Sequence, residues 1–431
     1  MIEHIRNFVK RSAASTLARN SGWMFLGYGL RTVVQAGYFV FIARALGPHE
    51  YGAFVGAMAL IAIVAPFASL GAGNLLIKNV SRDRSLLSDY WGNALFTTLL
   101  SGLFLVVCIV LLARWILPAS IPLSLIWMLC ISDLIAARII DIAGQCFQAL
   151  ELLSYTAKLN LLPYVLRFLS AGVLFIVWHR ASALRWGWFY LGSTSISCVV
   201  AVIVTNRSLG KPTLRLSRIG GEFKEGLYFC AGLSAQTVYN DIDKTMLARL
   251  STLDATGIYA AAYRLIDVSF APVRSVLNAA NSSFFRNGQH GIYVSYAYAK
   301  RLMPKMIVYS VLAFLGLFFA APVLPLVIGK EFARTVEALR WLALLPLLKT
   351  IHYFLSDAVT GAGYQGYRSA VQVSVAVANV GLNLWLIPLY AWRGAAWASL
   401  ACDGGLALAM YGVLMFVMAK ESHLITEVPS R

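Results

Sequence analysis

The stretch IARALGPHEYGAF at residues 42–54 decides the fold, because a related stretch, LARLSTLDATGIY, follows 205 residues later at residues 247–259. Five positions match without a gap, namely Ile42 with Leu247, Ala43 with Ala248, Arg44 with Arg249, Gly52 with Gly257, and Phe54 with Tyr259. Each copy lies between two long apolar segments. The shared offset and the shared position in the hydropathy pattern indicate that the chain consists of two related halves.

The composition excludes an ordinary soluble domain. Of the 431 residues, 59% are hydrophobic and only 13% are charged, whereas soluble domains carry roughly 25% charged residues. A water-soluble protein of this size would have to expose part of the apolar excess, which a lipid bilayer accepts as lipid-facing surface. We therefore predict an all-α integral membrane protein.

Twelve segments are long enough to cross a bilayer, since about 20 apolar residues span its hydrocarbon core. They cover approximately residues 21–45, 52–77, 90–113, 120–148, 155–178, 186–206, 223–249, 257–283, 304–328, 336–361, 368–390 and 394–419. With the internal repeat, they predict two pseudo-symmetric six-helix bundles around a central cavity, which is typical of transporters. The predicted parts are an interfacial N-terminal segment (1–20), a first bundle (21–208), a connecting loop (209–222), a second bundle (223–419) and a tail (420–431).

The placement of the basic residues predicts the orientation in the membrane. The net charge is +17, and Lys and Arg concentrate before the first predicted segment, after the second, around residues 207–224 and after the eighth. The positive-inside rule then puts both termini and the connecting loop in the cytoplasm. This topology accounts for the basic charge without a nucleic-acid partner.

The sequence has no motif for catalysis or for a bound cofactor. It contains no P-loop, GxSxG, HExxH or glycine-rich dinucleotide motif, and its predicted loops are too short to hold a soluble domain. Six cysteines lie within apolar segments without CxxC spacing, which favours packing over disulfide or metal binding. We expect no enzyme activity, no cofactor and no metal site, and an ion gradient, the membrane potential or the substrate gradient as the energy source.

Charged residues inside the predicted spans are the candidates for function. A charge at the bilayer centre costs about 2.5–3.5 kcal/mol, so it persists only where it is paired, hydrated or functional. Residues three or four positions apart share a helix face, and such pairs can be purely structural. Four pairs have this spacing: Arg138 with Asp141, Asp241 with Lys244, Arg264 with Asp267, and Glu337 with Arg340.

Arg31, Arg167 and Lys349 lie near the middle of their segments without a carboxylate at that spacing. Two interpretations stay open. Either a carboxylate from another helix neutralises them, or they face the cavity and bind a phosphate-bearing substrate, for which arginine offers a bidentate fork. The candidate carboxylates are Asp133, Asp357 and Asp403, and further candidate substrate-binding residues are Arg264 and Arg274 on the eighth segment.

The seventh predicted segment is the most polar, with Asn240, Asp241, Asp243 and Lys244 side by side. A carboxylate in a low dielectric can take up and release a proton near neutral pH, which suits coupling to an ion gradient. A structural network explains the same residues equally well. These four residues are therefore the candidates for ion coupling.

The segment ARALGPHEYGAF at residues 43–54 resembles the opening of the polysaccharide-transporter family, which includes the Wzx-type O-antigen flippases. Two further regions agree with this family: the seventh and eighth helices, through Asp243, Gly257, Tyr259 and residues 262–265, and the eleventh and twelfth, through Asn379, Asn383, Pro388 and residues 394–396. The resemblance covers nearly the whole chain in order and topology. It implies the fold shared by multidrug-exporting (MATE) carriers and the lipid II flippase.

The resemblance also implies a function. The expected substrate is a polyprenyl diphosphate-linked oligosaccharide, such as a lipopolysaccharide O-antigen or exopolysaccharide repeat unit. It would move by alternating access from the cytoplasmic to the periplasmic leaflet of the bacterial inner membrane, with polysaccharide assembly proteins, a polymerase or a chain-length regulator, as partners. Lipid II itself fits less well, because the second predicted segment has no basic residue between Tyr51 and Ile77.

Two other functions fit the sequence less well. A MATE-type antiporter of drugs or organic cations on the same fold favours an acidic cavity, which the mid-span cations contradict. A membrane glycan polymerase or ligase usually needs a sizeable outer loop, and the predicted loops are short.

Overall fold

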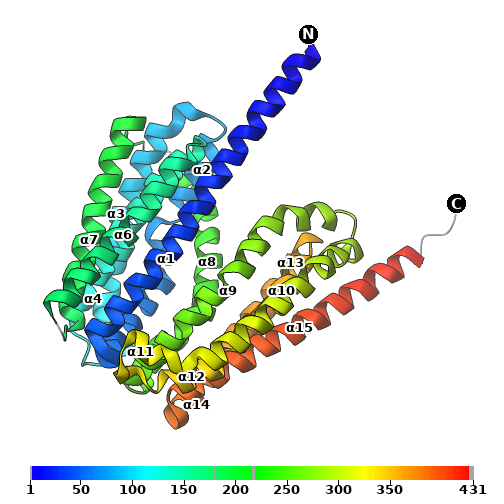
Figure 1. Ribbon diagram of the computed structural model, residues 1–431. Coiled ribbons are helices and arrows are strands. Elements are labelled where there is room, and N and C mark those ends of the chain that lie inside the picture. The colour runs from blue at the N-terminus through cyan, green and yellow to red at the C-terminus, as the bar shows by residue number, and fades with distance from the viewer. Residues whose placement is uncertain (1, 179, 216–218, 427–431) are drawn as a thin grey trace. The chain divides into compact units, whose positions relative to one another are not determined.

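The computed structural model describes residues 2–178, 180–215 and 219–426, with side chains from residue 30 onward except in part of 219–236 and beyond residue 422. Every regular element in these ranges is helical (Figure 1), which confirms the predicted all-α class. The predicted interfacial face of residues 1–20 lies outside the described side chains. The predicted connecting loop and tail extend into residues 216–218 and 427–431, which lie outside the described ranges.

Nine helical stretches of the described residues are long and apolar enough to cross a membrane. They are Leu30–Ser69, Arg84–Ile116, Leu123–Ala149, Leu153–Val177, Ala183–Leu209, Ile292–Ile328, Thr335–Gly361, Gln365–Tyr390 and Trp392–Ser422. The first of these holds two of the twelve predicted segments. The seventh and eighth predicted segments correspond to α8 (Ile219–Leu250), whose side chains are only partly described, and to α9 (Leu253–Gly288), which carries charges along one face.

Contacts divide the chain into two compact units, residues 1–241 and 242–431. Helix α8 begins in the first unit and ends in the second, and the domain limits predicted from the sequence remain a prediction. The other elements of the first unit are α1 (Ile2–Val64), η1 (Ala65–Ser69), α2 (Ala72–Val80), η2 (Arg84–Leu86), α3 (Leu87–Ile116), α4 (Leu123–Cys130), the π-helix η3 (Ile131–Ala136), α5 (Ala137–Ala149), α6 (Leu153–Val177) and α7 (Ala183–Leu209).

The first copy of the repeat forms a corner inside α1. Gly47 has φ 69° and ψ 174°, a conformation that essentially only glycine adopts. Beside it, the Ala45 carbonyl accepts a hydrogen bond from the Ala181 N–H at 2.9 Å, and the Glu50 carboxylate accepts one from the Ala183 N–H at 2.6 Å. The corner is thereby tied to the start of α7.

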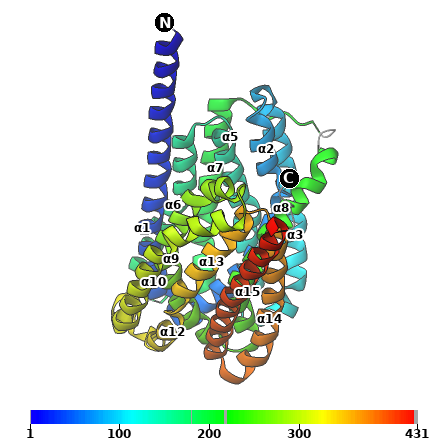
Figure 2. The same cartoon turned by 90° about the vertical axis from the view of Figure 1, so that its right-hand side faces the viewer.

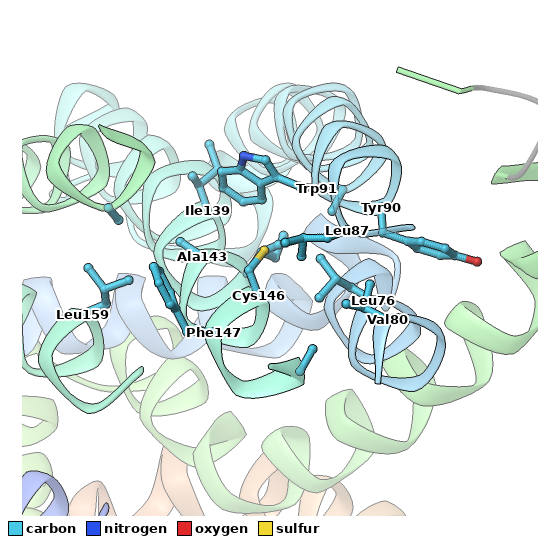
Figure 3. Packing of buried hydrophobic residues seen from close by; sticks show 14 of the residues in the cluster. Leu76, Val80, Leu87, Tyr90, Trp91, Ile139, Ala143, Cys146, Phe147 and Leu159 are labelled. Carbon is cyan, nitrogen blue, oxygen red and sulfur yellow. The ribbon is translucent and has the colours of Figure 1, made fainter. Parts of the chain in front are cut away.

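Large apolar side chains from α2, α3, α5, α6 and α7 form a core of the first unit (Figure 3). Trp91 and Phe147 are its largest fully buried members, and the Trp91 indole N–H donates to the Asn206 side-chain oxygen at 2.9 Å. In a bilayer such side chains stabilise the core through close van der Waals packing. This core holds α3 and α7 together where the connection to the second half begins.

Residues 210–215 of that connection lie along the start of α3. The Asn93 side chain accepts from the Arg215 N–H and donates to the Arg215 carbonyl, both at 2.9 Å. The Thr213 hydroxyl donates to Asp89 at 2.6 Å. Gly92 leaves room for this arrangement, because a Cβ there would lie 2.1 Å from the Thr213 carbonyl oxygen.

The second unit contains the end of α8 and the remaining helices (Figure 2). They are α9, α10 (Ile292–Ala320), η5 (Ala321–Val323), α11 (Leu324–Ile328), η6 (Lys330–Phe332), α12 (Thr335–Leu342), α13 (Leu345–Gly361), α14 (Gln365–Tyr390) and α15 (Trp392–Thr426). Its apolar core includes Phe270, Val273 and Leu277 from α9 together with Phe354 from α13. One face of α9 therefore packs inside this unit.

The second copy of the repeat also forms a corner, between α8 and α9. Thr252 corresponds to Gly47 at the repeat offset. Its backbone is extended (φ −116°, ψ 154°), and its hydroxyl accepts the Ala255 N–H at 3.1 Å, capping α9. The helix thus breaks at the same repeat position in both halves, with a glycine in one and a threonine cap in the other.

Candidate functional site

Two cations of the first unit share one aromatic ring. The Arg31 guanidinium carbon, on α1, lies 4.3 Å from the centre of the Tyr164 ring on α6, and that of Arg167, one turn further along α6, lies 5.9 Å from it. A cation over a ring face is stabilised by the ring quadrupole, by about 0.5–2 kcal/mol. In the described part of the chain, Arg31 has no carboxylate within ion-pair distance.

Arg167 is held more firmly than Arg31. Its terminal nitrogen lies 3.4 Å from the Asp133 carboxylate and donates to the Thr194 hydroxyl at 3.0 Å, and its guanidinium carbon lies 3.9 Å from the Tyr190 ring centre. The Tyr190 hydroxyl donates to both Asp133 oxygens, at 3.0 and 3.2 Å. Arg167 thus has a carboxylate from another helix, that of Asp133, beside it.

The π-helix η3 presents Asp133 to this cluster. A π-turn inserts an extra residue into the helical ladder and commonly occurs at functional sites. The 3.4 Å distance is long for a charge-assisted bond, which is ordinarily about 2.7–2.9 Å. Asp133 thus orients Arg167 but leaves part of its hydrogen-bonding fork available.

Helix α9 has three distinct faces. The first is buried in the second unit and contains Ile266, Phe270 and Val273. The second is apolar and partly exposed, with Val268 and Ala279. The third is polar and exposed or half-buried, with Ala271 as an apolar interruption. It consists of Arg264, Asp267, Arg274, Ser275, Asn278, Asn281 and Ser282, which lie on one side of the helix.

The two arginines predicted for the eighth segment both lie on this polar face. Arg274 is exposed, with its guanidinium carbon 5.7 Å from the Phe270 ring centre. Arg264 and Asp267 have the spacing of a local pair, but no ion pair joins these side chains among the described residues. Sharing a helix face permits such a pair but does not compel it where water competes.

Lys349 is buried inside the second unit, with 4% of its surface exposed. Its ammonium donates to the Tyr263 hydroxyl at 2.7 Å and lies 4.8 Å from the centre of that ring. The Lys244 ammonium lies 4.3 Å from the same ring centre. In the described structure the Lys349 side chain is thus enclosed by its own bundle.

Asp243 belongs to a buried polar network of the second unit. Its carboxylate accepts from the Tyr259 hydroxyl and, at 2.7 Å, from the Lys244 N–H. The Ser399 hydroxyl lies 3.0 Å from that of Tyr259. Asn240 and Asp241, the other predicted ion-coupling residues, are half-buried on the same helix.

A histidine that the sequence analysis missed lies in the same unit. His352 and Asp403, on α13 and α15, are both buried, with the His352 Nε2 atom 3.1 Å from the carboxylate. Asp357, which was considered as a partner for a central cation, instead pairs with Arg368 at 3.1 Å. These contacts join residues 51 and 11 positions apart. Such spacings do not correspond to neighbours on one helix face, so the sequence pattern does not predict the contacts.

Two of the other local pairs have definite outcomes. Arg138 and Asp141 form the predicted pair at 3.1 Å. The predicted pair of Glu337 with Arg340 is wrong, because the Arg393 guanidinium of α15 binds Glu337 through two hydrogen bonds of 2.9 and 3.0 Å. Bidentate geometry from a neighbouring helix is the stronger arrangement.

The fold is that of MOP superfamily transporters. The chain is similar to an inward-facing multidrug resistance MATE transporter (TM-score 0.72, 14% identity, 92% of this chain and 96% of that chain) and to the lipid II flippase MurJ in an inward closed conformation (0.72, 14%, 92% and 87%). It is also similar to a MOP superfamily transporter from Pyrococcus furiosus, described by the reverse polarity of its binding pocket (0.63, 14%, 95% and 96%).

The sequence comparison supplies the family. Residues 17–282 match the model described as polysaccharide biosynthesis protein, and the chain belongs to that family. No curated protein matches the chain. Together these findings describe a multi-pass membrane protein whose relatives by family and fold are transporters and flippases.

Proposed function

We propose that this protein is a flippase for a polyprenyl diphosphate-linked oligosaccharide, an O-antigen or exopolysaccharide repeat unit. The observation that carries the proposal is the pair of guanidinium groups on Tyr164. Arg31 has no carboxylate partner among the described residues, and Arg167, which is paired with Asp133, lies beside the same ring. A diphosphate offers several anionic oxygens in a compact group, which suits two arginine forks approaching one ring.

Alternating access then moves only the head of the substrate. The diphosphate binds Arg31 and Arg167 in the predicted cavity, the sugars stay in water, and the lipid chain remains in the bilayer. Arg264 and Arg274, on the polar face of α9, are the additional cations for the head. Lys349 is the least accessible of the predicted substrate-binding residues, so its part in binding requires a rearrangement of Tyr263.

The return of the empty carrier requires an energy source. The buried Asp243, with its Tyr259 and Ser399 contacts, is the candidate group for binding a coupling ion, and Asn240, Asp241 and Lys244 adjoin it on α8. We retain the predicted orientation, with both termini cytoplasmic in a bacterial inner membrane, and polysaccharide assembly proteins as partners. The protein acts in transport rather than in catalysis.

Arg31 also argues against a MATE-type antiporter for organic cations. An uncompensated guanidinium repels a cationic substrate and attracts an anionic one. The MATE relatives share only 14% identity with the chain, so the similarity supports its fold and says nothing about its substrate.

The test measures how much lipid-linked glycan can be reached from the outer leaflet. Cells with and without this protein are treated with a membrane-impermeant reagent that labels the glycan. We expect accessible glycan only in cells that contain the protein, and at least a tenfold loss for Arg31→Ala. Arg185→Ala is the matched control, since Arg185 also lies against a ring, that of Trp178 at 5.8 Å, but at the exposed start of α7. Equal labelling with and without the protein would overturn the proposal.

A further inference from the structure

The outer part of the polar face of α9 carries uncharged side chains that its own unit does not use. Asn278, Asn281 and Ser282 are exposed, and they make no hydrogen bond to any other described residue. Phe285 follows on the same side, one turn after Asn281, and is 48% exposed. This set, Asn278, Asn281, Ser282 and Phe285, is the amide ladder.

Lipid does not account for the amide ladder. An amide in hydrocarbon without a hydrogen-bond partner costs about 2 kcal/mol or more. At the same level of α9, Val276 is half-buried against the core and Ala279 is exposed on the other side, so the helix separates an apolar face from a polar one. The polar side chains at this end of α9 therefore need water or another polar partner beside them.

The chemistry of the ladder fits sugar hydroxyl groups. An asparagine side chain both donates and accepts hydrogen bonds, as a sugar hydroxyl does. From Asn278 to Phe285 the ladder rises about 10 Å along the axis. An exposed phenyl ring at the end, such as that of Phe285, offers a flat apolar surface to the C–H face of a sugar ring.

We propose that the amide ladder is the glycan subsite of the transporter, and that Asn278 and Asn281 determine which oligosaccharide is accepted. This inference rests on the proposed function and adds to it the part of the protein that recognises the sugars. The charged residues of the polar face, Arg264 and Arg274, are separate from the amide ladder, which is the uncharged part of this face. Recognition of the anion and of the sugars is therefore carried by different residues.

The experiment compares two lipids on the full-length protein in nanodiscs. One is undecaprenyl diphosphate, which has no sugar, and the other is the lipid-linked oligosaccharide extracted from cells that lack this protein. For the double variant Asn278→Ala with Asn281→Ala we expect about tenfold weaker binding of the glycan-bearing lipid. Binding of undecaprenyl diphosphate should change less than twofold. Phe285→Ala should act in the same direction, by a smaller factor.

The controls separate this inference from the proposed function. Ser269→Ala removes a polar group from another face of α9, where the hydroxyl donates to the Ile266 carbonyl at 2.8 Å, and should leave both affinities unchanged. Arg31→Ala should weaken both lipids alike. If the ladder variants weaken both lipids equally or neither, the glycan subsite is wrong, whereas the flippase still stands. If the unaltered protein binds neither lipid, both proposals are wrong.

Discussion

Asp133 and Asp141 follow each other closely in the sequence, but their arginine partners have different surroundings. The side chains of Arg167 and Asp133 are 12% and 16% exposed, whereas those of Arg138 and Asp141 are 32% and 47% exposed. Water screens the second pair and replaces its hydrogen bonds readily. The ion pair of Arg167 with Asp133 therefore contributes more to stability than the ion pair of Arg138 with Asp141.

Replacing Asp133 by Asn should lower the free energy of unfolding by about 1–3 kcal/mol, because Arg167 keeps its charge without a counter-ion. Asp141→Asn is the matched control and should cost less than about 1 kcal/mol. The measurement is thermal denaturation of the purified protein in detergent. Similar shifts for the two variants would show that Asp133 is not the counter-ion of Arg167. Adding Arg167→Gln to Asp133→Asn should recover part of the loss.

Asp243 is the residue for which ion coupling can be tested most directly. We expect Asp243→Asn to remove the dependence of translocation on an imposed proton or sodium gradient. The amide of asparagine neither exchanges a proton near neutral pH nor supplies a negative charge. The assay uses proteoliposomes with each gradient imposed in turn. Asp357→Asn, which alters a carboxylate paired with Arg368, should keep the dependence. Unchanged activity and ion dependence in Asp243→Asn would exclude this role.

Among the helices, the corner at Gly47 depends on one backbone conformation. Gly47→Ala should destabilise the protein by about 1–3 kcal/mol, because a Cβ strains the backbone at φ 69°. The control is Gly192→Ala inside α7, where a Cβ would meet no other atom within 4 Å. That change should stabilise by up to about 1 kcal/mol, since alanine favours the helix. Opposite signs in thermal denaturation are the expected result, and equal signs would contradict it.

The end of α15 is attached to two other elements of its unit through Glu421. Its carboxylate accepts from the Ile292 N–H at 3.0 Å, at the start of α10, and from the Tyr364 hydroxyl at 3.2 Å. Partial burial and the Glu421 carboxylate raise the pKa of Tyr364 above its ordinary value, so this phenol keeps its proton at neutral pH.

Removing this attachment should loosen the start of α10. Glu421→Ala leaves the first N–H group of α10 without its cap, which costs about 0.5–2 kcal/mol. Hydrogen exchange at residues 292–295 should become faster, whereas Ser422→Ala, which changes the neighbouring residue, should leave it unchanged. Unchanged exchange in Glu421→Ala would show that the cap does not stabilise the start of α10.

At the scale of the whole molecule, orientation is the property that the sequence predicts and that fusion proteins can test. A fluorescent protein attached after residue 431 should fluoresce, because the C-terminus is predicted to be cytoplasmic. Alkaline phosphatase fused after Leu117, at the end of α3, should be active, since that turn is predicted to be periplasmic. The opposite pattern, with a dark fluorescent protein and inactive alkaline phosphatase, would show that the topology is inverted and that the basic loops lie outside the cytoplasm.

Hydropathy predicted the helices well because a bilayer imposes a minimum apolar length on each of them. The partners of the buried charges were harder to predict. Arg167 meets Asp133 from a helix 34 residues away, and Lys349 meets Tyr263 from one 86 residues away. Only packing of helices in space determines such contacts. The role of tyrosine was harder to predict for the same reason, since Tyr164 meets Arg31 and Tyr263 meets Lys349 across helices that are far apart in the sequence.

The corners at Gly47 and Thr252 have a consequence for the history of the chain. If one ancestral segment was copied, the helix break was present before the two copies diverged to glycine at position 47 and threonine at position 252. The bend is then at least as old as the duplication. Each half has since kept the bend by different chemistry, a glycine with positive φ in one and a capping threonine in the other. Few of the neighbouring residues in the two copies are still alike.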